Sequence, residues 1–261
     1  MDDDSGDILV RAGFKTRGLF ASMRPGRLLD IPAGGGIQSR ALAAMGYDVV
    51  SADLFPGESS GATISVVRAD ANQAFPFRAS SFDYVLSREG IEHLENQTGF
   101  LRECARVLKP GGTIVITTPN LMHLSARVSM FLTAQRNMRR GLINEVQTLR
   151  GRTGPYLYHG HAFMLDYFRM RYMMRVESFE SINVFTDHYS PTSIALAPIV
   201  PILWLAMRYS AAISNRQRKR KSRTSTPDAV ASEIIRHVLS PAMLFGKRMI
   251  VTAVRSANSK R

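Results

Sequence analysis

Short apolar segments alternate with amphipathic ones through the first half of the chain. Five segments rich in branched and aromatic side chains are predicted strands, over residues 27–31, 47–54, 64–70, 81–89 and 113–119. Helices are predicted over 38–46 and 99–109, and in the second of these Leu101, Cys104 and Leu108 lie on one face. This alternation favours an α/β fold, in which helices cover both faces of a parallel sheet.

The second half of the chain is less regular. Its pattern predicts a helix over 163–176, a strand over 179–189, a helical start to 233–245 and a last strand over 247–255. Segment 135–154 has five arginines and several glycines, and it predicts either a mobile flap or a basic surface helix.

The composition permits a sizeable core. With 261 residues, 45% of them hydrophobic, we expect a single domain over 1–261. The net charge of +13 favours an anionic partner, which could be nucleic acid, anionic lipid or a phosphorylated substrate. Cys104 is the only cysteine, which excludes an intramolecular disulfide and a cysteine-rich zinc site, and we expect it to be a small buried residue. The acidic start has no long apolar run after it, which predicts no secretory signal and a cytoplasmic location.

A glycine-rich turn and an acid give the strongest chemical signal. Gly34, Gly35 and Gly36 follow the first strand, and they let the backbone approach a ligand and take a positive φ. The N–H groups of the next helix begin just beyond this turn. Asp53 ends the second strand, where a carboxylate can accept hydrogen bonds from two vicinal ribose hydroxyls. The pair therefore predicts a nucleoside-binding site at the carboxyl ends of parallel strands.

The turn matches neither the G-x-G-x-x-G pattern of dinucleotide sites nor a G-x-x-x-x-G-K-[ST] phosphate loop. Its sequence, LLDIPAGGG, resembles the first motif of class I S-adenosylmethionine-dependent methyltransferases. Asp30, Gly34 and Gly36 match that motif, while Pro32 stands in place of its first glycine. The closest backbone approach would then run from Ala33 to Gly36.

The resemblance continues over residues 25–120, which we expect to form the cofactor-binding core. It implies S-adenosyl-L-methionine as the cofactor, and a Rossmann-like sheet of seven mostly parallel strands whose last strand, 247–255, is antiparallel. Asp30 would accept from the methionine ammonium or cap N–H groups of the loop. The other cofactor contacts that it implies are the ribose acid Asp53 with Leu54, the adenine-binding Asp70 with Ala71, and Ser87 in the fourth-strand motif.

Candidate bases follow the fourth strand. In SREGIEHLEN, Glu89, Glu92 and His93 lie where the methyl group should point, and His93 either takes the acceptor's proton or packs on the sheet and bonds to backbone. Other histidines are candidates as well, namely His123, His159 and His161. His161 could line the acceptor pocket within the region 135–175. We predict no metal ion, because no acid cluster accompanies the histidines of YHGHAF.

The acceptor is constrained only by class. The chain lacks the N-P-P-[YF] motif of enzymes that methylate DNA bases or glutamine, which favours a glycan, lipid-linked or other small-molecule acceptor, methylated at oxygen. The stretch VITTPNLMHLSARVSMFL is similar to methyltransferases encoded among bacterial polysaccharide- and lipid-modifying enzymes. Two alternatives stay open: a soluble quinone-type methyltransferase, and a non-catalytic cofactor-binding or RNA-associated protein.

An apolar and then basic insert, 192–240, precedes the last strand. Its apolar run, 194–207, contains Pro198 and Pro201, and we expect it to be too short to span a bilayer. Trp204 and six basic residues between 216 and 223 suit an anionic membrane surface, which would make the protein peripheral. The alternatives are a core or dimer helix with a solvated linker, and a nucleic-acid contact. The oligomeric state stays open.

Overall fold

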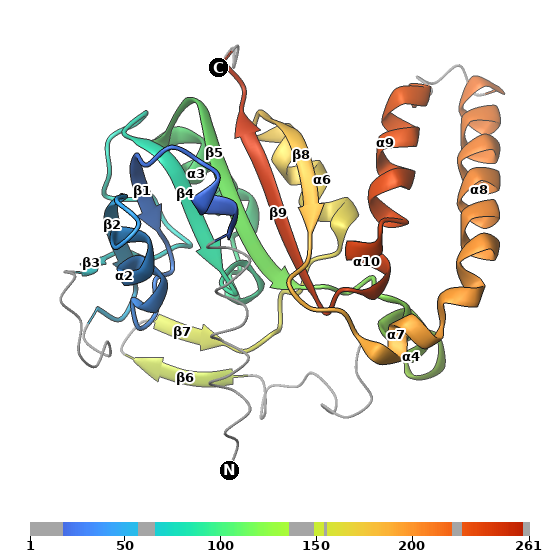
Figure 1. Ribbon diagram of the computed structural model, residues 1–261, viewed down its shortest axis with the longest axis horizontal. Coiled ribbons are helices and arrows are strands. Elements are labelled where there is room, and N and C mark those ends of the chain that lie inside the picture. Colours follow the sequence, from blue (N-terminus) through green and yellow to red (C-terminus); the bar gives the residue numbers. More distant parts are fainter. Residues whose placement is uncertain (1–17, 57–65, 136–148, 154–155, 221–225, 258–261) are drawn as a thin grey trace.

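A seven-stranded sheet forms the centre of the molecule, in the order β3-β2-β1-β4-β5-β9-β8 (Figure 1). The computed structural model describes residues 18–56, 66–135, 149–153, 156–220 and 226–257. The sheet strands are β1 (Arg27–Asp30), β2 (Asp48–Asp53), β3 (Val66–Arg68), β4 (Phe82–Arg88), β5 (Leu108–Pro119), β8 (Phe179–Phe185) and β9 (Arg248–Arg255).

The first five strands of the sheet are parallel to one another, and β9 is antiparallel to both of its neighbours, β5 and β8. The fold class predicted from the sequence is therefore confirmed, including the antiparallel last strand. The boundaries expected for the cofactor core, the basic region and the insert stay predictions.

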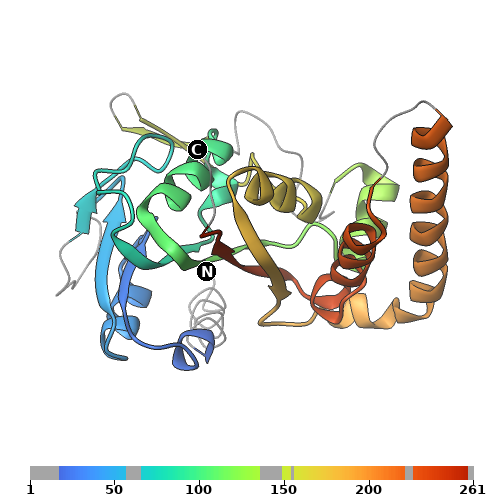
Figure 2. The same ribbon diagram turned by 90° about the horizontal axis from the view of Figure 1, so that it is seen from above.

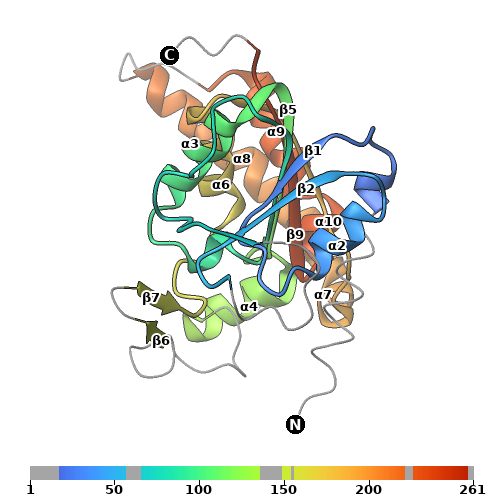
Figure 3. The ribbon, with the colours of Figure 1, turned by 90° about the vertical axis from the view of Figure 1, so that its left-hand side faces the viewer.

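Helices lie on both faces of this sheet (Figure 3). The helices of the described residues are α2 (Ile37–Ala43), α3 (Gln97–Val107), α4 (Leu124–Thr133), α6 (Tyr167–Val176), α7 (Pro191–Ala195), α8 (Val200–Arg220), α9 (Asp228–Val238) and α10 (Pro241–Phe245), with 3₁₀ turns η1 (Ile91–His93) and η2 (Ala197–Ile199).

The side-chain alternation of the strands builds a separate core on each face. Leu29 of β1 packs among residues of α3 and α6, whereas Leu28 packs with Leu42 of α2 on the other side. Cys104 is fully buried in the larger core, and burial raises the pKa of its thiol well above the usual value. The thiol is thus a packing group, as the sequence predicts, and each fully buried leucine, isoleucine or phenylalanine of the same core stabilises the fold by roughly 1.5–3 kcal/mol.

Two strands have ends that differ from the predicted ones. The β5 strand already begins at Leu108, which pairs with Phe82, and the Pro-Gly-Gly sequence then forms an irregularity before Tyr84 pairs with Thr113. Gly111 has φ +79° there, a conformation that glycine adopts without strain. The strand predicted over 179–189 ends at Phe185.

Part of the basic segment 135–154 is a strand, and the flap or surface helix expected for the segment stays a prediction. Residues Leu149–Thr153 form β6, which pairs antiparallel with β7 (Tyr156–His159) in a separate two-stranded sheet. Backbone pairing with β7 satisfies the N–H and C=O groups of Leu149–Thr153. Residues 136–148, which hold the other three arginines, lie outside the described residues.

The insert is more helical than its prolines suggest. Pro198 lies at the start of η2 and Pro201 in the first turn of α8, positions where the missing proline N–H costs no hydrogen bond. The helix therefore continues for 21 residues, into the basic stretch. The expectation that this run is too short to span is wrong, because the helical segment Ala197–Arg218 is long and apolar enough to cross a membrane by length and composition.

Candidate cofactor and acceptor site

The loop after β1 presents an open backbone surface. Its Ala33 N–H donates to the Ala52 carbonyl on β2 at 2.9 Å, which holds the loop at the carboxyl edge of the sheet. Gly34 has φ +51° and Gly36 has φ +68°, and a Cβ added to Gly34 would meet nothing within 4 Å. Glycine is needed at these positions for its conformation, and the space in front of Gly34 can admit a ligand.

Asp53 and the glycine loop are bonded to each other directly. The Gly34 N–H donates to Asp53 Oδ2 at 2.8 Å, and the Phe55 N–H donates to Oδ1 at 3.0 Å. Each carboxylate oxygen keeps capacity for a further hydrogen bond. The two features that the sequence singles out therefore meet in one place, with an oriented carboxylate beside an open loop.

Asp70 and Ala71 lie next to this carboxylate. Two residues after β3, Asp70 follows Ala69, whose N–H donates to the Asp53 carbonyl at 2.9 Å. The Asp70 side chain accepts from the Asn72 N–H at 2.8 Å, and Ala71 is buried. Leu54 is half-buried at the end of β2. The predicted ribose and adenine residues thus form one continuous edge.

Asp30 is buried at the end of β1. Its carboxylate is 2% exposed and accepts from the Ser39 hydroxyl on α2 at 2.5 Å. Burial raises the pKa of Asp30 to about 6, while the Ser39 hydrogen bond and the charge of Arg88 oppose that rise and the charge of Asp53 adds to it. A cation at this end of β1 would favour the ionised form.

The loops after β1 and β4 pack together at Pro32 and Gly90. A Cβ on Gly90 would lie 2.5 Å from the Pro32 ring, so only glycine fits against it. The sequence did not indicate this contact. The glycine at position 90 leaves room for the proline ring that stands where the resembled motif has its first glycine. Ser87 lies beneath the contact, fully buried, and its hydroxyl is 3.3 Å from the same Cβ position. Its role as a cofactor contact stays a prediction.

The acceptor candidates Glu92, His93 and His161 come together. Their possible ligand atoms all lie within 4.8 Å of one another, and the two imidazole rings are 5.1 Å apart. Glu92 is fully buried and accepts from the Thr118 hydroxyl at 3.0 Å. These three residues, called the 92–93–161 cluster below, are brought together from η1 and from the chain just after β7.

The environment of His93 defines its tautomer. Its Nδ1 lies 2.7 Å from the His159 carbonyl and 3.1 Å from that of Gly160. Carbonyl oxygens only accept, so Nδ1 carries the proton and Nε2 is the basic nitrogen. The sequence offered backbone bonding of His93 as the alternative to a catalytic role. The structure shows the backbone bonds at Nδ1, and Nε2 is still the basic nitrogen, so the two roles are compatible.

The other candidates are engaged in structural contacts. His123 caps α4 and bonds to Ser193 at 3.0 Å, and His159 Nε2 lies 2.6 Å from Glu95. Glu89 pairs with Arg248 at 2.9 Å.

An acid does accompany one histidine of YHGHAF, so the reason for predicting no metal ion was wrong. Glu92 and His93 lie beside His161, and the group could hold an ion by position. The absence of a metal remains a prediction.

A charged network that the sequence did not reveal lies at the β4 and β5 edge. Arg248, at the start of β9, bonds to Glu89 and, at 2.5 Å, to Asp187. Arg88 is largely buried, and its pKa is lowered by burial, while the charge of Asp30 opposes that shift. The network ties the end of β4 to strands from the last third of the chain.

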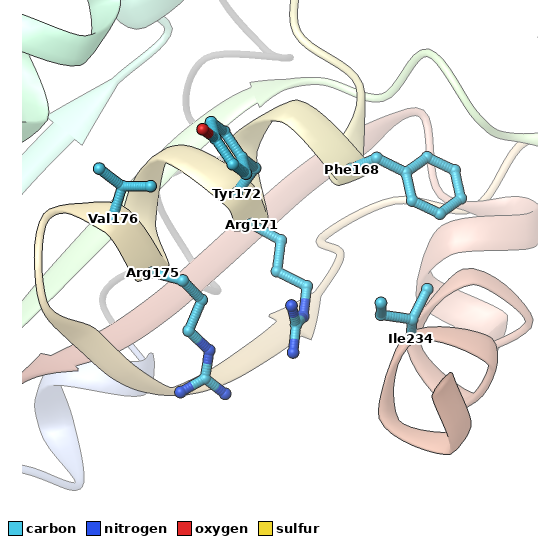
Figure 4. Close-up of a pocket in the computed structure, with 6 residues that line it drawn as sticks. All are labelled: Phe168, Arg171, Tyr172, Arg175, Val176 and Ile234. Carbon is cyan, nitrogen blue, oxygen red and sulfur yellow. The ribbon is translucent and has the colours of Figure 1, made fainter. Parts of the chain in front are cut away.

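A pocket of about 420 Å³ lies elsewhere, between α6 and α9 (Figure 4). Phe168, Tyr172 and Ile234 line it with two arginines, and it shares no residue with the glycine loop or the 92–93–161 cluster.

Residues 29–116 match the family model described as a methyltransferase domain. Residues 29–116 therefore belong to a class I S-adenosylmethionine-dependent methyltransferase domain. The match begins one residue before Asp30 and ends within β5, so it contains the whole loop-and-acid arrangement.

Curated relatives resemble this domain over part of their length. A ubiquinone biosynthesis O-methyltransferase of Cereibacter sphaeroides is 37% identical over 103 residues, covering 36% of this chain and 41% of the relative. One from Sinorhizobium fredii is 35% identical over 113 residues, covering 40% and 46%. The chain thus matches less than half the length of these relatives.

Solved structures share the fold over nearly the whole chain. A SAM-dependent methyltransferase from Archaeoglobus fulgidus superposes with a TM-score of 0.56 at 15% identity, covering 95% of this chain and 93% of that one. Phosphoethanolamine N-methyltransferase 2 of Haemonchus contortus, in complex with S-adenosyl-L-methionine, gives 0.50 at 20% identity, covering 94% and 52%. At these identities the likeness concerns the fold alone.

Proposed function

We propose that this chain transfers a methyl group from S-adenosyl-L-methionine to a hydroxyl oxygen of a small molecule. The observation that carries the proposal is the bond between the Gly34 N–H and Asp53, in front of open space at the carboxyl edge of a methyltransferase domain.

The residues at this edge fit the cofactor. Asp53 would accept from the ribose hydroxyls, Asp70 from the adenine amino group, and Asp30 from the methionine ammonium. The backbone from Ala33 to Gly36 would pass close to the cofactor because no side chain of Gly34 stands in the way. When bound, the cofactor supplies an electrophilic methyl group on a sulfonium.

His93 is the group that would take the acceptor's proton. Its Nδ1 proton is held by two backbone carbonyls, so Nε2 can act as a general base. The buried Glu92 and the adjacent His161 would orient the acceptor and the imidazole. A general base of this kind contributes about 10²–10⁴-fold to turnover.

The relatives' names support a hydroxyl-bearing acceptor, since they describe O-methyltransferases of ubiquinone biosynthesis. We therefore rank an apolar, quinone-type acceptor first, and a lipid-linked or glycan acceptor second. The similarity to these relatives covers 36% and 40% of this chain, so the acceptor itself has to be found by experiment.

The test is transfer of radiolabelled methyl groups into separated lipid, glycan, RNA and small-molecule extracts. Label should enter the apolar small-molecule fraction, and the His93→Ala variant should label it far more slowly than His188→Ala, which alters an exposed histidine outside the site. Cofactor binding without label in any fraction would instead support a non-catalytic binding protein, and label in RNA would contradict the proposed acceptor class.

A further inference from the structure

The helix α8 stands at the far edge of the molecule and lies against α9, as Figures 1 and 2 both show. Among its residues, Leu203, Met207 and Ala211 are half-buried and repeat at four-residue intervals, which defines its inner face. The helix α9 is anchored to the body through Glu233, which pairs with Arg171 at 3.0 Å and Arg175 at 3.2 Å. The body of the protein therefore holds α8 in place while its outer side faces solvent.

The outer side of α8 is apolar along its first half. Ile202, Leu205 and Tyr209 are 66%, 61% and 70% exposed, and at 100° per residue they lie opposite the inner face. Trp204 is 47% exposed on the flank of the helix, between the inner face and the outer stripe, and the Arg208 guanidinium lies 5.5 Å from its ring. Several large apolar side chains on one exposed helix face mark an interaction surface.

The second half of the same side is basic. Arg216 and Arg220 continue the stripe of Ile202, Leu205 and Tyr209 at helical spacing, and both are exposed. The helix has five basic residues and no acidic one in its sequence. An apolar stripe that continues into arginines, with Tyr209 between, matches the acyl and headgroup layers of an anionic bilayer.

Exposed apolar side chains also occur on α7 and α4. Ile194 on α7 is 50% exposed, and Phe131 and Leu132 at the end of α4 are 89% and 64% exposed. The helices α7 and α4 are joined by the bond between Ser193 and His123.

We propose that α8 docks on an anionic lipid bilayer, lying along the surface with Ile202, Leu205 and Tyr209 in the acyl boundary and Arg216 and Arg220 among the headgroups. A second copy of the chain would bring like charges together, and nucleic acid would leave the apolar stripe in water. A spanning orientation would place Arg208 near the middle of the bilayer. Docking goes beyond the proposed reaction, because it depends on α8 and not on methyl transfer.

The experiment uses the full chain with vesicles of phosphatidylcholine, with and without phosphatidylglycerol. We expect sedimentation with the anionic vesicles only, a blue shift of the emission of Trp204, which is the only tryptophan, and release at high salt. Reversing two charges in Arg216→Glu/Arg220→Glu should weaken binding by about tenfold or more.

Matched controls separate docking from general effects of charge and apolarity. Tyr209→Asp should reduce vesicle binding, whereas Tyr172→Asp, which alters an equally exposed tyrosine on α6 (70% for each), should not. Arg24→Glu/Arg78→Glu, in exposed residues away from α8, should also bind normally. Each variant should keep wild-type cofactor affinity, which shows that it is folded.

Several results would overturn the proposal: no lipid-dependent sedimentation and no emission shift, equal binding to neutral vesicles, or tight RNA binding in place of lipid binding. Release from cell membranes by detergent alone, and not by salt, would replace surface docking by a spanning helix. Methyl transfer is measured on the same preparation, so failure to dock and failure to catalyse are distinguished.

Discussion

Replacing Asp53 with alanine is the sharpest test of the cofactor site. The substitution removes a carboxylate that the Gly34 and Phe55 N–H groups orient at 2.8 and 3.0 Å. Both oxygens would be lost as acceptors for the ribose hydroxyls, and the loop would lose a bond that holds it at the strand edge. The fold itself should persist, since Asp53 is only partly buried and lies at a strand end.

The size of the effect follows from the number and kind of bonds. A hydrogen bond to a charged group contributes roughly 1.5–3 kcal/mol. Two ribose bonds are not additive, because water reaches the exposed half of the site, so we expect a loss of about 2 kcal/mol. That loss corresponds to roughly 30-fold weaker S-adenosyl-L-methionine binding.

Calorimetric titration of wild type and variant measures this difference directly. Asp48→Ala is the matched control, because Asp48 is an exposed acid at the other end of the same strand. It should bind the cofactor as wild type does. Equal affinities for wild type and Asp53→Ala, in a folded variant, would remove Asp53 from the site.

Four further outcomes follow from the site. Gly34→Val should abolish cofactor binding in a folded protein, because valine resists φ +51° and would fill the space in front of the loop; near-normal affinity would show that the ligand lies elsewhere. Cofactor affinity should fall as pH drops through about 6, because protonated Asp30 offers the ammonium no charge, and Asp30→Asn should bind weakly with no such dependence. His93→Ala should lower turnover about 10²-fold or more with unchanged cofactor affinity, and a fully active variant would point to another base. Chelation by EDTA should leave activity unchanged if the 92–93–161 cluster acts by proton transfer, whereas a loss that added divalent ions restore would assign the cluster to a metal ion.

The sheet and the cofactor edge follow from local sequence. Apolar strands alternating with helices define parallel pairing, and parallel pairing brings the strand ends together, so Gly34 and Asp53 meet although 19 residues separate them. The helix α4 was missed because His123, an unusual capping residue, starts it and its pattern is only weakly amphipathic. The length of α8 was underestimated because the two prolines read as breaks, although they lie where a helix tolerates them.

Contacts between distant side chains have no such local signal. The contact of Pro32 with Gly90 joins two loops, and nothing in either sequence specifies the other. His161 reaches His93 only because the chain after β7 folds back over η1. Sequence reasoning named both histidines, but it could not place them together or add Glu92 to them as a potential ligand.

The family match informs the part of the site that could be predicted from the sequence, and it informs the rest of the site less. Residues 29–116 supply the loop, Asp53 and Asp70, and this is the part that matches the methyltransferase family model. His161 completes the cluster proposed for the acceptor, and Asp187 and Arg248 form ion pairs that hold the end of β4 against β9. All three lie outside the match. The residues proposed to bind the cofactor therefore lie inside the match. The cluster proposed for the acceptor combines Glu92 and His93 inside the match with His161 outside it, so the acceptor has to be measured on this chain.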